Sequence, residues 1–190
     1  VFLVPSMRGG GSERFMSILV SSINRKKYDI TLVLIKKEGM YLNDLPSDLD
    51  IIDLNCDRVR YSIFKIVKLL FKIKPDVVFS TLSYLNLLLA ILRPLFPSDM
   101  KFIARESNTV SVNNKQQKYP SIFNILYKLF YNNFDIIIAQ AQFMRNDLIS
   151  NFGINHNKIK VIYNPIDFER VKTLSLGECN DYRQGCLKLL

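Results

Sequence analysis

The sequence contains no tryptophan, three cysteines and a single histidine among its 190 residues. Cys56, Cys179 and Cys186 are too few and too scattered for a disulfide framework, and with His156 they show no zinc-ligand spacing. No serine or cysteine triad can be assembled around the one histidine. We therefore expect a cytoplasmic protein from a reducing compartment, without a metal site.

The sequence also lacks a long apolar run. The longest such stretch, residues 82–96, contains Asn86, Arg93 and Pro94. It is shorter than the roughly 20 residues that a membrane-spanning helix needs. No signal peptide is visible, and the chain starts inside an apolar run without an initiator methionine, so we expect its first residues to be missing or removed.

Positive charge is abundant: 26 Lys and Arg against 17 Asp and Glu give a net charge of +9. This balance favours an anionic partner, either a nucleic acid, an acidic lipid surface or a phosphorylated substrate, although it also serves simple solubility. No helix-turn-helix, RNP or zinc pattern supports nucleic-acid binding, so we expect no nucleic acid partner. The 48% hydrophobic content predicts a folded domain with a sizeable core.

Short apolar runs alternate with helix-length segments along the chain. The predicted strands are Val1–Val4, Ile30–Ile35, Ile51–Leu54, Val77–Ser80, Phe102–Ala104, Ile136–Ala139 and Ile159–Ile162. The predicted helices are Ser12–Asn24, Ser62–Lys74, Tyr84–Leu92, Ser121–Asn132 and Gln142–Asn151. Continuous apolar strands alternating with helices predict a doubly wound, mostly parallel α/β sheet of Rossmann-like type.

The pattern changes after Asp167. Residues 168–190 contain no convincing strand and hold two of the three cysteines. We expect one domain over residues 1–167, followed by a linker or an atypical tail over residues 168–190.

A glycine turn, Gly9-Gly10-Gly11, follows the first strand and precedes a helix. It does not match the dinucleotide-binding fingerprint, which needs a glycine at Arg14, and no Gly-Lys-Ser/Thr follows as in a Walker A loop. Glycines before a helix leave backbone N–H groups open to an anion, and phosphate is the usual one. The turn and the neighbouring Arg8 therefore form a candidate phosphate site; the alternative is a flexible turn without a ligand.

A second polar group, Arg105-Glu106-Ser107-Asn108, follows the predicted strand Phe102–Ala104 and should line the same crevice. Glu106 is a candidate base or partner of an acceptor hydroxyl, and Arg105 is a candidate phosphate contact. The alternative is an Arg105–Glu106 ion pair that only fixes the loop. The polar segment Thr109–Lys118, which lacks apolar periodicity, is expected to be a long loop.

Two helices carry features of a membrane-docking surface. The segment Ser121–Tyr131 is apolar nearly all round, with Lys118 and Lys128 nearby, and Ser62–Lys74 has a basic face of Lys65, Lys68 and Lys72. Together they predict peripheral contact with an anionic membrane. The alternative is a core helix and a solvated basic face.

Four segments in this order resemble the N-terminal half of the retaining glycosyltransferases of family four, which have the two-domain GT-B fold. They are GGGSER at 9–14, KPDVVFS at 74–80, ARESN at 104–108 and KIKVIYNPID at 158–167. The resemblance covers roughly residues 1–170. Arg105-Glu106 resembles the corresponding residues of relatives that build bacterial surface glycans, such as lipopolysaccharide or capsule, on polyprenyl diphosphate.

The resemblance implies specific roles. Gly9, Gly10 and Gly11, with Arg8, would close over the diphosphate of a nucleoside diphosphate sugar, a co-substrate rather than a bound cofactor. Arg105, Ser107 and Asn108 would contact a glycan acceptor linked to polyprenyl diphosphate, with Glu106 as the catalytic candidate. The enzyme would work at the inner face of the cell membrane.

The C-terminal donor-binding domain of the family has no counterpart in these 190 residues, so we expect the chain alone to be inactive. A competing interpretation is a non-catalytic module, or the partner half of a split enzyme, that binds phosphorylated glycan.

Overall fold

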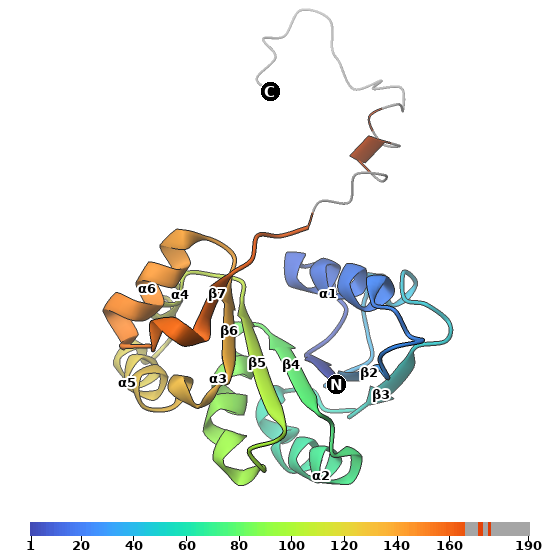
Figure 1. Cartoon of the computed structure of the whole chain (residues 1–190), viewed down its shortest axis with the longest axis horizontal. Helices are drawn as coiled ribbons and strands as arrows, with labels where there is room; N and C mark the ends of the chain where they lie inside the picture. Colours follow the sequence, from blue (N-terminus) through green and yellow to red (C-terminus); the bar gives the residue numbers. More distant parts are fainter. Residues whose placement is uncertain (166–170, 173–174, 176–190) are drawn as a thin grey trace, which may run out of the picture.

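A computed structural model describes residues 1–165, 171–172 and 175. Its centre is one seven-stranded sheet with the strand order β3-β2-β1-β4-β5-β6-β7 (Figure 1). The strands are β1 (Phe2–Val4), β2 (Thr31–Leu34), β3 (Asp50–Asp53), β4 (Val77–Thr81), β5 (Lys101–Glu106), β6 (Ile136–Ala139) and β7 (Ile159–Val161).

Six α-helices and five short 3-10 turns connect these strands within the described residues. The helices are α1 (Gly11–Ser22), α2 (Ile63–Ile73), α3 (Ser83–Leu92), α4 (Val110–Lys115), α5 (Pro120–Phe130) and α6 (Gln142–Phe152). The 3-10 turns are η1 (Met40–Leu42), η2 (Val59–Tyr61), η3 (Arg93–Leu95), η4 (Tyr131–Asn133) and η5 (His156–Lys158).

All six pairs of neighbouring strands run parallel. The chain builds β1, β2 and β3 outward in one direction, then crosses back and adds β4 to β7 on the other side of β1. The predicted fold class, a doubly wound Rossmann-like sheet, is confirmed. The strand order reverses between β1 and β4, where such sheets leave a crevice beyond the strand ends.

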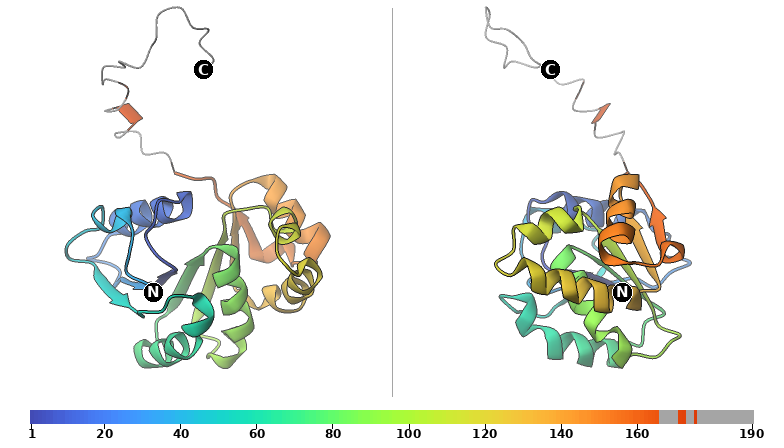
Figure 2. Two further views of the ribbon diagram at one scale, coloured as in Figure 1. Left: turned by 180° about the vertical axis from the view of Figure 1, so that it is seen from behind. Right: turned by 90° about the vertical axis from the view of Figure 1, so that its left-hand side faces the viewer.

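The strands supply alternate residues to the two faces of the sheet. Val4 of β1 and Phe79 of β4 pack on the α1 face, whereas their neighbours Leu3 and Val78 join a larger cluster on the opposite face. That larger cluster also takes in buried residues of α2, α3, α5 and α6. Figure 2 shows α2 and α3 in front of the sheet when the molecule is seen from behind. Two buried faces explain why the central strand β1 is apolar throughout.

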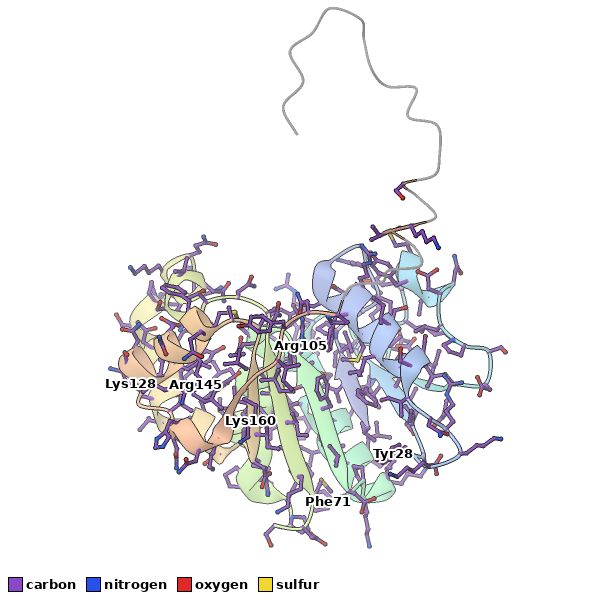
Figure 3. The ribbon with its side chains drawn as sticks, turned by 45° about the horizontal axis from the view of Figure 1, so that its top comes forward. Tyr28, Phe71, Arg105, Lys128, Arg145 and Lys160 are labelled. Atoms are coloured by element: carbon purple, nitrogen blue, oxygen red, sulfur yellow. The ribbon has the colours of Figure 1, made fainter. Side chains whose placement is uncertain are left out.

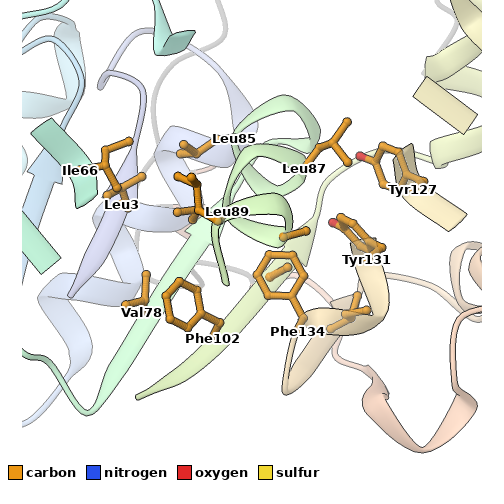
Figure 4. Packing of buried hydrophobic residues seen from close by; sticks show 14 of the residues in the cluster. Leu3, Ile66, Val78, Leu85, Leu87, Leu89, Phe102, Tyr127, Tyr131 and Phe134 are labelled. Carbon is orange, nitrogen blue, oxygen red and sulfur yellow. The ribbon is translucent and has the colours of Figure 1, made fainter. Parts of the chain in front are cut away.

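The larger cluster includes the aromatic rings of Phe102, Tyr127, Tyr131 and Phe134 (Figure 4). The Tyr127 and Tyr131 rings lie 4.5 Å apart, centroid to centroid, and Tyr131 meets Phe134 edge-on at 5.2 Å. Both tyrosines are almost fully buried, so their hydroxyl groups must find hydrogen-bond partners inside the protein. Those partners belong to the site described below.

The expected long loop at Thr109–Lys118 is wrong in part, because α4 forms over Val110–Lys115. Val110 and Asn114, four residues apart, are both buried against the domain, which gives this polar segment one inward face. The Asp147 carboxylate of α6 accepts a hydrogen bond from the Ser111 backbone N–H at 3.0 Å, in place of a local cap. A helix that is capped from 36 residues away has no local sequence signal.

The predicted boundary at Asp167 and the linker or tail at 168–190 lie outside the described residues, apart from Val171, Lys172 and Ser175. Within the described residues, no helix combines the length and apolar character that crossing a membrane requires.

Gly39, in the turn after β2, holds the start of the glycine turn in place. Its φ angle of 119° is rarely adopted by other residues, and a Cβ there would collide with the backbone of Met7 and Arg8. This close approach lets the Met7 N–H donate to the Glu38 carbonyl at 2.9 Å and the Tyr41 N–H donate to the Met7 carbonyl at 3.1 Å. The segment 38–41 is thus bonded to the chain just before the glycine turn.

We expect Gly39→Ala to destabilise the domain by at least about 1–3 kcal/mol, the usual cost of a strained backbone conformation. At this chain length each kcal/mol lowers Tm by about 2–4 °C. Thermal unfolding followed by circular dichroism measures the change. Gly11→Ala is the matched control, because a Cβ at Gly11 meets open space. Equal Tm values for the two variants would show that the Gly39 contact does not matter.

Candidate functional site

The candidate site lies at the carboxyl edge of the sheet, where the strand order reverses between β1 and β4. The glycine turn follows β1 on one side of this crevice, and residues 82–83 follow β4 on the other. Arg105, near the end of the neighbouring β5, lies at the same edge, remote from Phe71 and Tyr28 at the other end of the sheet (Figure 3). The structure therefore brings together the two polar segments that the sequence singled out.

The glycine turn delivers the chain directly to the N-terminus of α1. Gly10 occupies the N-cap position with extended backbone, and no side chain caps the helix. The Arg14 N–H donates to the Gly10 carbonyl at 3.0 Å as the first helical bond, so the preceding N–H groups of α1 have no helical partner. These N–H groups and the helix dipole together suit an anion.

Glu13 stands in the first turn of α1, over Gly10. A Cβ added to Gly10 would collide with the Glu13 carboxylate, so the carboxylate lies close to the helix N-terminus. Negative charge is favourable there, and Glu13 supplies it within the chain itself. An incoming phosphate would have to displace this flexible side chain, which is a prerequisite for the predicted role of the turn.

Arg8 is exposed beside the turn and pairs with Glu38, with the guanidinium Nη2 2.5 Å from the carboxylate Oε1. A surface ion pair of this kind contributes only about 0–1 kcal/mol. The guanidinium is therefore available to a phosphate at little energetic cost. The predicted diphosphate contacts of Gly9, Gly10, Gly11 and Arg8 stay predictions.

Leu82 joins β4 to α3 with a backbone conformation that is unusual for a side-chain-bearing residue. Its φ angle is 79°, and it stands at the N-cap position of α3. Such strain costs about 1–3 kcal/mol and persists only where the surroundings impose it. Here it turns the chain so that Ser83 and the N-terminus of α3 face the buried end of β5.

The loop predicted at Arg105–Asn108 begins later than expected, because β5 continues through Glu106. Successive strand residues point to opposite faces, so Arg105 faces α1 and Glu106 faces α3 and η4. The alternative interpretation, an Arg105–Glu106 ion pair, is wrong. The ion pairs of the described residues do not include one between these two side chains.

The Arg105 side chain is only 2% exposed and is held from three sides. Its guanidinium donates to Thr81 Oγ1 at 3.2 Å and to Asn164 Oδ1 at 2.6 Å, and it lies 3.7 Å from the centroid of the Phe15 ring of α1. Burial lowers the pKa of Arg105 to about 10, so the side chain stays charged at neutral pH. Its predicted contact with an acceptor phosphate requires that one of these partners release it.

Glu106 is fully buried and is surrounded by hydrogen-bond donors. Oε2 accepts from the Ser83 hydroxyl at 2.7 Å, and Oε1 accepts from Asn86 Nδ2 at 3.1 Å and from the Tyr131 hydroxyl. Burial raises the pKa of Glu106, and the hydrogen bonds from Tyr131, Asn86 and Ser83 offset part of that rise. Because α3 and η4 supply these donors, the carboxylate bonds β5 to the helices behind the sheet.

Burial also raises the pKa values of Tyr127 and Tyr131 well above the ordinary value, and the nearby Glu106 charge adds to the effect. The Tyr127 hydroxyl donates to the Ser83 carbonyl at 3.2 Å. Both tyrosines therefore act here as neutral hydrogen-bond donors.

The other two predicted acceptor contacts differ from each other. The Ser107 hydroxyl is buried and has no hydrogen-bond partner among the described residues, whereas Asn108 is exposed. An unbonded buried hydroxyl is costly, and a ligand group that reached it would gain a hydrogen bond. The roles of Ser107 and Asn108 stay predictions.

Asn86, Tyr131, Phe15 and Gly39 complete this site and were not singled out from the sequence. Asn86 and Tyr131 lie inside apolar helical segments, where polar groups in a buried stripe are the only available signal. In the sequence, nothing distinguishes Phe15 from an ordinary core residue of a helix. Gly39 follows Lys-Lys-Glu in an exposed turn, which shows its position but not its close approach to Met7.

We expect Glu106→Gln to remove part of the pH dependence of stability. The raised pKa means that the folded state binds the proton more tightly than the unfolded state. Glu106 therefore contributes stability below its ordinary pKa of 4.5, and this contribution is lost as the pH rises above that value. The free energy of unfolding of the wild type should fall, relative to that of the variant, as the pH rises above 4.5 in urea titrations.

Asp44→Asn, which removes an exposed carboxylate, controls for the change in net charge. Curves for wild type and Glu106→Gln that stay parallel over this pH range would contradict the expectation.

The fold and the open N-terminus of α1 define the class of the protein: a Rossmann-like domain that matches one half of solved GT-B structures. It superposes on the Anabaena protein HepE, solved in complex with UDP and glucose, with a TM-score of 0.61 and 17% identity, covering 88% of this chain and 45% of HepE. A glycosyltransferase from Rickettsia africae gives a TM-score of 0.65 and 16% identity, with 93% and 45% covered. A UDP-N-acetylglucosamine 2-epimerase from Rickettsia bellii gives 0.63, so the fold also serves another activity.

Sequence relatives narrow the class. The chain is 28% identical over 185 residues to a Campylobacter jejuni N-acetylgalactosamine-N,N'-diacetylbacillosaminyl-diphospho-undecaprenol 4-alpha-N-acetylgalactosaminyltransferase, covering 91% of this chain and 49% of that enzyme. It is 30% identical over 117 residues to an uncharacterised glycosyltransferase of Methanocaldococcus jannaschii, covering 59% and 29%. The chain thus spans about half or less of the length of the curated relatives that it matches.

The family model "Glycosyltransferase Family 4" matches residues 9–170. The chain belongs to this family, and it forms a glycosyltransferase domain of the N-terminal type. The resemblance drawn from the sequence is confirmed.

Proposed function

We propose that this domain is the acceptor-side half of a retaining glycosyltransferase. The full enzyme would transfer a hexosyl group from a nucleoside diphosphate sugar to a glycan linked to polyprenyl diphosphate, in the synthesis of a bacterial surface glycan. The observation that carries the proposal is the uncapped N-terminus of α1 behind the glycine turn, at the reversal point of a parallel sheet. The name of the Campylobacter relative and the UDP and glucose of the HepE complex support the two substrate classes.

In the full enzyme, this half would stabilise the negative charge of the leaving diphosphate. When the sugar leaves its donor, negative charge develops on the diphosphate, and prearranged N–H groups lower the energy of that charge. The first N–H groups of α1 are such donors, and Arg8 adds a mobile positive charge. No nucleophile from this half is required. Glu106 could assist an acceptor hydroxyl only if Ser83 or Tyr131 moved, because both now donate to its carboxylate.

The transferase proposal is tested with the intact gene product that contains this domain. Labelled transfer from a panel of nucleotide sugars to polyprenyl-diphosphate-linked saccharides should show turnover, and residues 1–190 alone should show none. Gly10→Val should abolish turnover while preserving the fold, because a branched Cβ would block the approach of phosphate to the turn. Gly11→Ala serves as the matched glycine control for folding.

Absence of transfer from every donor, with intact protein, would favour the non-catalytic binding module. Normal kinetics in Gly10→Val would show that the glycine turn does not bind the phosphate of the donor.

We also propose peripheral contact with an anionic membrane. Ile122, Ile125 and Leu129 on α5 are 54%, 55% and 65% exposed, and Lys128 lies next to them in the sequence. Lys68 and Lys72 are exposed on α2, but the Lys65 ammonium donates to the Leu54 carbonyl at 2.7 Å and therefore contributes less to the basic face than predicted. Apolar side chains beside lysines suit a surface of acidic lipid.

Sedimentation with vesicles tests the membrane contact. Binding to vesicles that contain acidic lipid should exceed binding to neutral vesicles and should fall in high salt, because each lysine contributes about 1 kcal/mol that screening removes. Ile125→Asn with Leu129→Asn should weaken the binding. Leu95→Asn, which changes another exposed leucine on η3, should not. No binding to acidic vesicles at low salt would return α5 to an ordinary surface helix.

A further inference from the structure

A hollow of about 540 Å³ opens beside the glycine turn, on the α2 and α3 side of the sheet. It is lined by segments that follow β1, β2 and β3, by the first residue of α2 and by one side of α3 from Tyr84 to Ile91. Its volume lies within the roughly 300–1,000 Å³ of ordinary ligand pockets. Ser6 and Arg8 belong both to this hollow and to the approach to the glycine turn, so the two regions are adjacent.

The walls of the hollow are apolar, and its rim is basic. Ile63 of α2 lines it together with Leu87, Leu88 and Ile91 of α3. The rim carries four positively charged side chains and two carboxylates. They are Arg8, Lys36, Arg58 and Arg60, with Glu38 and Asp57. This division between apolar walls and a charged rim fits an amphiphilic anion better than it fits a neutral sugar.

The two carboxylates are already used by two of the cations. Glu38 pairs with Arg8 at 2.5 Å, and Asp57 accepts a hydrogen bond from Lys36 at 2.6 Å. Within residues 1–165, no carboxylate forms an ion pair with Arg58 or Arg60. Arg60 instead donates to the neutral Tyr61 hydroxyl at 2.9 Å. Two arginines that form no ion pair within these residues therefore stand at the rim, at the start of η2 and within it, and the Asp57 carboxylate lies near the first of them.

The segment that bears these arginines is held in place before any ligand arrives. The Asp53 carboxylate accepts the Asn55 N–H at 2.8 Å, and Asn55 takes a φ angle of 48° that turns the chain after β3. The Lys65 ammonium donates to the Leu54 carbonyl at 2.7 Å, and the Ser62 hydroxyl donates to the Val59 carbonyl at 2.7 Å. A prearranged loop binds its ligand at a smaller entropic cost.

We propose that this hollow binds a diphosphate joined to an aliphatic chain. Arg58 and Arg60 hold the phosphate oxygens, because guanidinium groups match phosphate geometry. The first part of the chain lies along Leu88 and Ile91 of α3. This assignment rests on the proposed function for the nature of the acceptor, and it places the acceptor's diphosphate in a site of its own, apart from the glycine turn that faces the donor.

Binding can be measured directly on the chain of residues 1–190, without transfer activity. Farnesyl diphosphate, kept below the concentration at which it forms micelles, is titrated by calorimetry and compared with inorganic pyrophosphate, farnesol and UDP. Farnesyl diphosphate should bind at least about ten-fold more tightly than pyrophosphate or farnesol, since burying a few CH₂ groups contributes about 0.8 kcal/mol each. UDP, which lacks the aliphatic chain, should bind more weakly than farnesyl diphosphate.

Variants separate the two parts of the site. Arg58→Gln with Arg60→Gln should weaken farnesyl diphosphate at least about ten-fold, because charge-assisted hydrogen bonds to phosphate are strong. Leu88→Gln should weaken farnesyl diphosphate and leave pyrophosphate unchanged. Lys26→Gln with Lys27→Gln, which removes the same charge from exposed positions after α1, should change neither.

Two results would overturn the proposal: unchanged affinity in the double arginine variant, or equal affinity for farnesyl diphosphate and pyrophosphate. The outcome is independent of the transferase assay. Binding that depends on the arginines, without transfer by the intact protein, refutes the proposed function and keeps the site. Transfer to polyprenyl-linked acceptors that is unaffected by the arginine variants does the reverse.

Discussion

The parallel direction of all seven strands decides where this domain can bind a ligand. Each strand ends at the same edge of the sheet, so segments far apart in the sequence meet there: residues 5–11 after β1, 82–83 after β4 and 105–108 at the end of β5. The reversal of strand order between β1 and β4 opens the crevice at this edge. Helices on both faces bury the remainder of the sheet and leave that edge to polar chemistry.

Strand alternation gives the neighbours Arg105 and Glu106 different tasks. One step along β5 moves a side chain from the α1 face to the α3 and α5 face. Arg105 therefore contacts Phe15, while Glu106 accepts hydrogen bonds from Ser83, Asn86 and Tyr131. A buried carboxylate with several donors is far less costly than an unpaired one, and the donors in turn hold α3 against the sheet.

The sequence predicted the elements whose signals are local. Apolar runs such as Val77–Ser80, and the periodic stripe of Ile66 and Leu70, report burial directly. The helix α4 has no such stripe beyond two residues and depends on the distant Asp147, so it was expected as a loop. In the same way, the glycine turn could be recognised from its composition. The role of Gly39, after β2, depends on its close approach to the backbone of Met7, after the neighbouring β1.

The candidate site shows the same division. Residue type was enough to single out Gly9–Gly11 and Arg105. Glycines before a helix, and polar groups at the carboxyl end of a strand, indicate ligand binding. Residue type could not show which partners these side chains meet. The ion pair considered for Arg105 and Glu106 was wrong because β5 runs two residues further than the apolar signal of Phe102–Ala104.

Arg105 also has a mechanical consequence. One guanidinium contacts Phe15 of α1 and Asn164 beyond β7, two segments that are remote in the sequence. The helix that begins at the glycine turn and the chain that leaves the last strand are thereby tied to the same side chain. A displacement of the chain at Asn164 would therefore disturb a side chain that also packs against the helix whose open end faces the crevice.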